Sequence, residues 1–157
     1  IKLHPFEDYL MYKKILKEID TKDIILVRDI DIFALIEASV LLMTINSTVG
    51  LEAMFLNKPV ITINLWKRKD TLPFAERGAA LGVYKSEEIA PAIERLLRDN
   101  QLKEKLEPSR KELISYYVGE LDGCSSDRVV NLINKMSIAS SKQRYIEKTL
   151  LEETPVH

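Results

Sequence analysis

The chain has 157 residues, enough for one hydrophobic core and a single domain of ordinary size. Hydrophobic residues make up 46% and charged residues 30% of it, a composition that excludes an intrinsically disordered protein. The formal net charge of -1 supplies no basic field that would attract nucleic acid or an anionic membrane. The single cysteine, Cys124, excludes an internal disulfide, and no apolar run reaches the roughly 20 residues of a membrane span, so we expect a cytoplasmic location.

The first half of the chain alternates short apolar runs with segments of helical spacing. Strands are predicted over residues 1–3, 24–27, 40–45 and 60–65, with a last short one at 83–84. Helices are predicted over residues 6–19, 32–38 and 48–56. The run at 24–27 is continuously apolar, which is typical of a strand covered on both faces. The alternation predicts an α/β fold: a Rossmann-like, doubly wound parallel sheet with helices on both faces.

The second half of the chain is predicted to be helical. Helices are expected from Ser86 to about residue 98, over about 101–117, and from about 126 to 136, with Pro108 breaking or kinking the second. Residues 1–136 are therefore expected to form one domain, followed by a polar tail or extra helix over 137–157. The chain starts at Ile1, without an initiator methionine, and we expect an upstream portion to precede it.

The most informative feature is the junction between the predicted strand at 40–45 and the helix at 48–56. Asn46, Ser47 and Thr48 lie where the strand ends, and unpaired N–H groups at the start of a helix attract an anion such as phosphate. Glu52 follows roughly 6 Å further along the axis, about the distance from a phosphate to the ribose of a nucleotide. Gly50 is unfavourable inside a helix, which indicates close approach of a ligand or a neighbouring backbone. The alternative is an ordinary helix cap.

Further polar residues follow the other predicted strands. His4, Asp29 and residues 64–67 fall, with the Asn46 junction, at the carboxyl ends of the strands, where parallel sheets bind ligands. His4 could donate to a phosphate oxygen, or be a surface histidine in a turn. The basic run 67–69 could clamp a diphosphate, or be an exposed loop. The spacing of cysteine and histidine offers no metal site, there is no glycine-rich phosphate loop, and no cofactor is expected.

These motifs resemble a known family. With His4-Pro5, the string Asn46-Ser-Thr-Val-Gly-Leu-Glu-Ala53 and Lys58-Pro-Val60, the chain is similar to the C-terminal, donor-nucleotide-binding half of GT-B type glycosyltransferases. It resembles the capsular and surface polysaccharide transferases in particular. It is also similar to CDP-glycerol glycerophosphotransferases and to UDP-N-acetylglucosamine 2-epimerases. The epimerases usually carry His-Arg-Arg-Glu where this chain has His4-Pro-Phe-Glu7, and a Ser-Gly-Gly turn at residues 46–48, which counts against that branch.

The resemblance implies a function for each of these residues. Ser47 and Thr48 would hold the phosphates of a UDP-, CDP- or CMP-linked sugar, Glu52 the ribose hydroxyls, and His4 a phosphate oxygen. The implied reaction moves the sugar to an acceptor hydroxyl in surface polysaccharide synthesis, with no metal. The acceptor site and the usual catalytic base belong to the N-terminal domain of such enzymes, so these residues alone are expected to bind nucleotide weakly and to be inactive. Two alternatives are an epimerase and a non-catalytic α/β module that binds a partner protein.

Overall fold

The computed structural model describes residues 1–152, without the side chains of residue 141 and of residues 144–152. Residues 153–157 of the predicted C-terminal tail lie outside the described part. The chain divides into two compact units, Ile1–Ile114 and Ser115–His157. Each unit is described by itself below.

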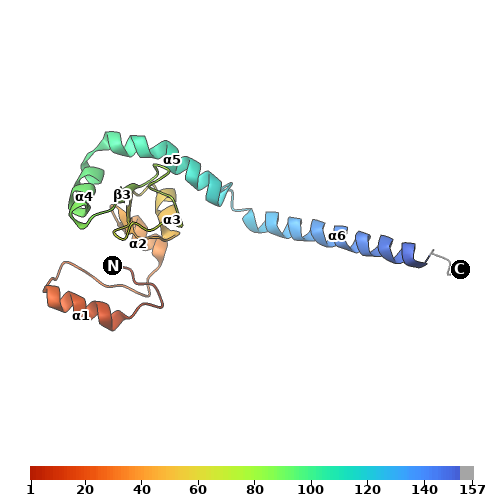
Figure 1. Ribbon diagram of the computed structural model, residues 1–157, viewed down its shortest axis with the longest axis horizontal. Helices are drawn as coiled ribbons and strands as arrows, with labels where there is room; N and C mark the ends of the chain where they lie inside the picture. Colours follow the sequence, from red (N-terminus) through yellow and green to blue (C-terminus); the bar gives the residue numbers. More distant parts are fainter. Residues whose placement is uncertain (153–157) are drawn as a thin grey trace. The chain divides into compact units, whose positions relative to one another are not determined.

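The first unit contains most of the helices and all of the strands that the structure describes (Figure 1). In chain order its elements are α1 (Tyr9–Ile19), α2 (Ile32–Ala38), β1 (Leu42–Thr44), α3 (Val49–Phe55), β2 (Val60–Ile63), β3 (Leu81–Val83), η1 (Ser86–Glu88), α4 (Ile89–Arg98) and the first part of α5 (Asn100–Val118). Side chains cap the starts of three helices: Asp8 accepts a hydrogen bond from the amide of Leu10, Asp31 from that of Ala34, and Asp99 from that of Leu102.

The three strands form a parallel sheet in the order β1-β2-β3. Leu42 is in register with Val60, and Ile61 with Leu81. The predicted α/β class and the parallel sheet are thus confirmed. Three strands in sequential order contain no reversal of direction, so the doubly wound topology stays a prediction.

Helices cover both faces of this sheet, because neighbouring residues of β2 belong to different hydrophobic clusters. Val60 packs with Ile36, Met54 and Phe74 in the cluster under α2 and α3. Ile61 packs in the other cluster, with Val83, Ala92, Leu96 and Leu102 from β3, α4 and α5. Alternate side chains of a strand point to opposite faces, so the two clusters lie on opposite sides. In Figure 1, α3 and α4 accordingly lie on either side of β3.

The N-terminal strands are shorter than the sequence predicts. Residues 1–3 and 24–27 meet in one parallel bridge, between Lys2 and Val27, instead of forming two full strands. The prediction that the run at 24–27 is covered on both faces is wrong, because Ile25 is 72% exposed. An apolar run shows that a segment favours burial, but it cannot show that a neighbouring strand is there to cover it.

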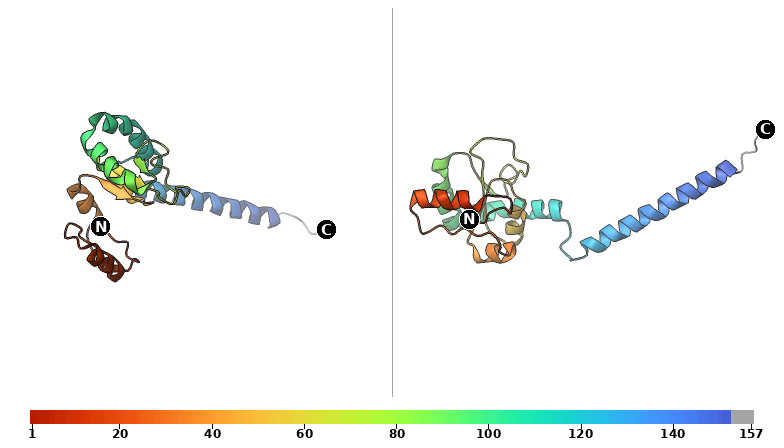
Figure 2. Two further views of the ribbon diagram at one scale, coloured as in Figure 1. Left: turned by 60° about the vertical axis from the view of Figure 1, so that its left-hand side comes forward. Right: turned by 90° about the horizontal axis from the view of Figure 1, so that it is seen from below.

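The second unit is built around α6 (Ser125–Glu152). This helix begins near the predicted position but continues without interruption past residue 136, as both views in Figure 2 show. Arg128, in the first turn of α6, forms an ion pair with Asp122 in the turn before the helix, with Nη1 and Oδ2 2.7 Å apart. That contact, with the amide of Cys124, lowers the pKa of Asp122 to about 2. Among the described helices, none combines the length and apolarity needed to cross a bilayer.

Candidate functional site

The turn between β1 and α3 is held by its own side chains. Asn46 donates from Nδ2 to Oγ1 of Thr71, 2.9 Å away, which ties the end of β1 to a loop that follows β2. Ser47 accepts from the amide of Val49 at 3.3 Å. Thr48 is the N-cap residue of α3, and its side chain makes no capping hydrogen bond. The turn therefore presents the exposed Thr48 hydroxyl next to a fixed Ser47.

The amides at the start of α3 already donate hydrogen bonds within the turn, so they are not free to bind an anion as the sequence predicts. Val49 donates to the Ser47 hydroxyl, Gly50 to the Ser47 carbonyl at 3.1 Å, and Leu51 to the Thr48 carbonyl at 2.8 Å. The expectation that several N–H groups here point outward without acceptors is wrong for these residues. A tight first turn, with bonds spanning three residues, satisfies groups that an ideal α-helix leaves open.

Gly50 has a packing explanation. It is buried, and a Cβ atom added there would lie 2.5 Å from Cε2 of Phe74. Phe74 is itself only 1% exposed. The close neighbour inferred from the sequence is therefore this aromatic ring of the core, and the structure accounts for Gly50 without a ligand.

Glu52 carries a buried polar atom without a partner. Its side-chain atom Oε2 is out of contact with water and accepts no hydrogen bond among the described residues, although the residue as a whole is only half-buried. A carboxylate oxygen removed from water without a donor costs free energy. Donors supplied by a bound molecule would remove this cost.

A cleft of about 550 Å³ opens at the carboxyl ends of β1 and β2. Its lining is formed by the residues that follow the two strands: Ile45, Asn46, Asn64, Trp66, Arg68, Lys69, Asp70 and Thr71. Both the position, at the carboxyl edge of a parallel sheet, and the size are typical of small-molecule sites. Of the predicted site residues, Asn46 lines this cleft, whereas Ser47, Thr48, Gly50 and Glu52 belong to the adjoining turn and helix.

Asn64 holds the loop over this cleft. Its side chain donates from Nδ2 to the carbonyl of Arg68 at 2.6 Å and to Oδ1 of Asp70 at 2.8 Å, and its Oδ1 accepts from the amide of Arg68 at 3.0 Å. Its own amide donates to the carbonyl of Val83 at 2.8 Å, so the same residue is fixed to β3. Sequence reasoning placed Asn64 at a strand end but missed Asp70 and Thr71, because hydrogen bonds across a loop leave no periodic signal.

His4 lies in a separate, local network at the N-terminus. Its amide donates to Oε2 of Glu7 at 2.6 Å, and its Nδ1 accepts from the amide of Phe6 at 3.3 Å. The hydroxyl of Tyr12 donates to the other oxygen of Glu7 at 2.7 Å. That bond, with the one from the His4 amide, lowers the pKa of Glu7, and the Glu7 contact raises the pKa of Tyr12. Among the described residues, no hydrogen bond joins His4 to the β1–α3 turn.

Arg28, which sequence reasoning missed, belongs to the same network. One of its terminal nitrogens donates to the Glu7 carbonyl, and its guanidinium carbon lies 5.9 Å from the centre of the Tyr9 ring. Its Nε is buried without an acceptor among the described residues. Arg28 directly follows Val27, as His4 follows Leu3, so both lie just past the one bridge that joins these segments.

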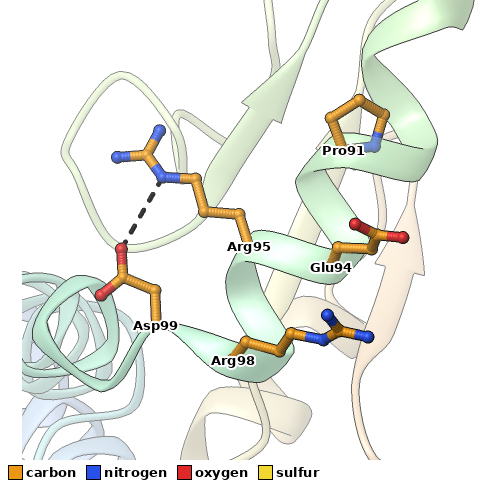
Figure 3. Close-up of a pocket in the computed structure, with 5 residues that line it drawn as sticks. All are labelled: Pro91, Glu94, Arg95, Arg98 and Asp99. Carbon is orange, nitrogen blue, oxygen red and sulfur yellow. Dashed lines mark ion pairs between the residues drawn. The ribbon is translucent and has the colours of Figure 1, made fainter.

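A second hollow, of about 390 Å³, lies along one face of α4 (Figure 3). Arg95 points toward Asp99, with 3.9 Å between Nε and Oδ2, whereas Glu94 and Arg98 point away from that pair. The side chains do not converge on one point where a ligand could bind. The exposed ion pair contributes little to the stability of the fold. The cleft beyond β1 and β2 is therefore the better candidate. No group of three metal-ligating side chains occurs in the part of the chain that the structure describes.

The comparison with protein families gives one match. Residues 1–65 match the Capsule polysaccharide biosynthesis protein family. The matched segment contains His4, the β1–α3 turn, Glu52 and Asn64, and it ends before the basic residues of the cleft. No curated protein and no solved structure matches the chain.

Proposed function

We propose that this chain is the donor-nucleotide-binding domain of a glycosyltransferase in capsular polysaccharide synthesis. The reaction would move a sugar from a nucleotide diphosphate, or from CMP, to an acceptor hydroxyl. The match of residues 1–65 to the capsule family supports the biological setting and favours this reading over an epimerase. The resemblance to GT-B enzymes assigns the acceptor site to an N-terminal domain of the same protein.

The observation that carries the proposal is the buried, unpartnered Oε2 atom of Glu52. Ribose offers two neighbouring hydroxyls, and a carboxylate accepts hydrogen bonds from both without changing its charge. Glu52 lies one helical turn after Thr48, roughly 6 Å along the axis, so a phosphate near Thr48 would bring the ribose to Glu52. Because Oε2 is covered by the protein's own atoms, a ribose hydroxyl would supply the missing donor after a rotation of the Glu52 side chain that uncovers this oxygen.

The phosphates would be held by hydroxyl, amide and imidazole donors. The Thr48 hydroxyl and the Asn46 amide lie at the mouth of the turn, and Ser47 fixes its backbone. His4 keeps Nε2 for a phosphate oxygen, because Nδ1 already accepts from Phe6. In this proposal the domain contributes orientation of the donor and stabilisation of the negative charge that develops on the departing phosphate.

A titration followed by NMR tests the proposal. UDP, CDP and CMP are added to the 157-residue chain, and we expect shifts at residues 47–52 with at least one of them. Glu52→Gln should weaken the binding of that nucleotide about tenfold, the effect of one charged hydrogen bond, and should leave inorganic pyrophosphate unaffected. Glu104→Gln, an exposed residue of α5, serves as the matched control. The proposal fails if none of the three nucleotides shifts residues 47–52.

A second candidate, a module that binds a partner protein, is favoured by one observation on α6. This helix exposes large apolar side chains, with exposed fractions between 54% and 64%: Val129, Val130, Leu132, Ile133, Met136 and Ile138. An exposed apolar surface of this kind is typical of an interaction site. Under this candidate, none of the nucleotides would shift the NMR signals of residues 47–52. Leu132→Ser with Met136→Ser would instead abolish binding of the partner protein.

A further inference from the structure

The positive charge that a phosphate needs is found in the cleft and not at the start of α3. The first amides of α3 already donate within the turn, so the helix terminus offers less to an anion than the sequence predicts. Arg68 and Lys69 line the adjoining cleft, and neither forms an ion pair with any side chain that the structure describes. Asp70 is the one carboxylate in the lining, which leaves the cleft with a net positive charge.

The loop that carries these cations depends on one side chain. Asn64 is only 8% exposed, and its side-chain hydrogen bonds go to residues 68 and 70 of this loop. The backbone turns sharply between Asn64 and Arg68. Lys67 has a φ of 49° there, a left-handed conformation that costs free energy for any residue other than glycine. The buried amide of Asn64 therefore holds the loop in a conformation that it would not favour alone.

The opposite wall of the cleft is also fixed. Asn46, at the end of β1, is joined to Thr71 at the far end of the same loop. The loop is thus attached at both ends, by Asn64 to β2 and by Thr71 to the β1–α3 turn. This attachment places the basic loop beside the turn where the donor phosphate is proposed to lie.

We propose that Arg68 and Lys69 bind a phosphoryl group of the ligand in this cleft, and that Asn64 is the residue that positions them. The inference rests on the proposed function for the identity of the ligand, a nucleoside diphosphate or its sugar derivative. It adds a residue, Asn64, that acts through the loop rather than by touching the ligand. It also explains how the site attracts an anion although the chain as a whole carries a charge of -1.

Binding of inorganic pyrophosphate and of UDP to the full chain, measured by NMR, tests the two cations. Arg68→Gln and Lys69→Gln, made one at a time, should each weaken pyrophosphate binding several-fold, and the two together at least about tenfold, because charge-assisted hydrogen bonds to phosphate are lost. Lys67→Gln is the matched control for each single variant: it removes one positive charge from the same loop, but Lys67 does not line the cleft, and we expect less than about a twofold effect. If Lys67→Gln weakens pyrophosphate binding as much as the changes at Arg68 and Lys69 do, overall charge explains the effect and the inference is overturned.

Asn64→Leu tests the positioning role, because it keeps the approximate size of the side chain, adds no charge beside Asp70 and removes both Nδ2 donations. If Asn64 acts through the cations, this change weakens pyrophosphate binding in the wild-type chain and adds nothing in the Arg68→Gln, Lys69→Gln background. Losses that simply add would show a role independent of the cations and overturn the assignment. Far-UV circular dichroism confirms that each variant is folded, and Asn64→Ser, which keeps one donor, should give an intermediate loss.

The two proposals fail in different ways. If UDP, CDP and CMP leave the wild-type spectrum unchanged while pyrophosphate shifts residues 66–71, the anion site stands and the nucleotide function is overturned. If a nucleotide binds the Arg68→Gln, Lys69→Gln variant as well as the wild type, the function stands and this inference is overturned. If pyrophosphate shifts nothing in the loop, the inference is overturned whatever the nucleotides do.

Discussion

Replacing Gly50 by alanine shows whether packing or a ligand excludes a side chain from this position. The added Cβ would lie 2.5 Å from Cε2 and 3.1 Å from Cδ2 of Phe74. Phe74 is 1% exposed, so its ring cannot move aside without disturbing the core. Overpacking of this kind costs about 1–3 kcal/mol, whereas alanine gains about 1 kcal/mol over glycine inside a helix. We therefore expect Gly50→Ala to lower the free energy of unfolding by about 1 kcal/mol.

Urea unfolding followed by far-UV circular dichroism measures this change, and a double-mutant cycle assigns it to the contact. Phe74→Leu removes the atoms that the new Cβ would strike, so the double variant should be more stable than the sum of the single effects by the overpacking cost, about 2 kcal/mol. If Gly50→Ala instead raises the free energy of unfolding by about 1 kcal/mol, helix propensity alone decides and the packing explanation is refuted. A loss of nucleotide affinity with unchanged stability would show that a ligand approaches Gly50.

The other predictions concern single contacts. Arg128 holds the pKa of Asp122 at about 2, so this ion pair should persist as the pH falls through 3.8, the ordinary pKa of an aspartate, and be lost only near pH 2. Arg128→Gln should raise the pKa of this carboxyl in an NMR titration. Tyr12→Phe should raise the pKa of Glu7 toward its ordinary value, visible in the same titration, since it removes the largest cause of the lowering. Lys58 donates from Nζ to two carbonyls at the end of α2, at 2.7 and 2.9 Å, so Lys58→Met should cost about 1 kcal/mol in urea unfolding.

Each of these predictions has an outcome that would contradict it. If the pKa of Asp122 is the same in Arg128→Gln as in the wild type, the Cys124 amide, and not the cation, sets this pKa. If the pKa of Glu7 does not change in Tyr12→Phe, the hydrogen bond from the His4 amide is what lowers it. For Lys58→Met, Lys111→Met is the control, because Lys111 makes only an exposed ion pair with Glu107; equal losses would count against a role at the end of α2.

The central β1–α3–β2 segment could be predicted from the sequence because its signals are local. Apolar runs set the strands, and Lys58-Pro59 separates α3 from β2 within a residue or two of the predicted positions. Helix ends were harder. α5 runs through Pro108 and α6 continues past residue 136, since neither a proline nor a polar composition is enough to end a long helix. The bridge between Lys2 and Val27 depends on which segments meet in space, which no local pattern encodes.

The candidate site was only partly predictable. Residue types placed Asn46, Ser47, Thr48 and Glu52 correctly at a strand–helix junction, and their role in binding stays a prediction. The rotation of the Ser47 side chain toward an amide of its own turn decides whether α3 can receive an anion, and sequence spacing does not reveal it. The cleft depends on contacts between residues far apart in the chain, such as Asn46 with Thr71.

The outer edge of β1 has a practical consequence. In the described part of the chain the sheet ends there, so the backbone groups of residues 42–44 that face away from β2 meet no further strand. A strand of only three residues leaves a short row of such groups, which is one of the ways in which proteins protect the edge of a sheet. Preparations of this chain at high concentration should therefore show little self-association through main-chain pairing at β1.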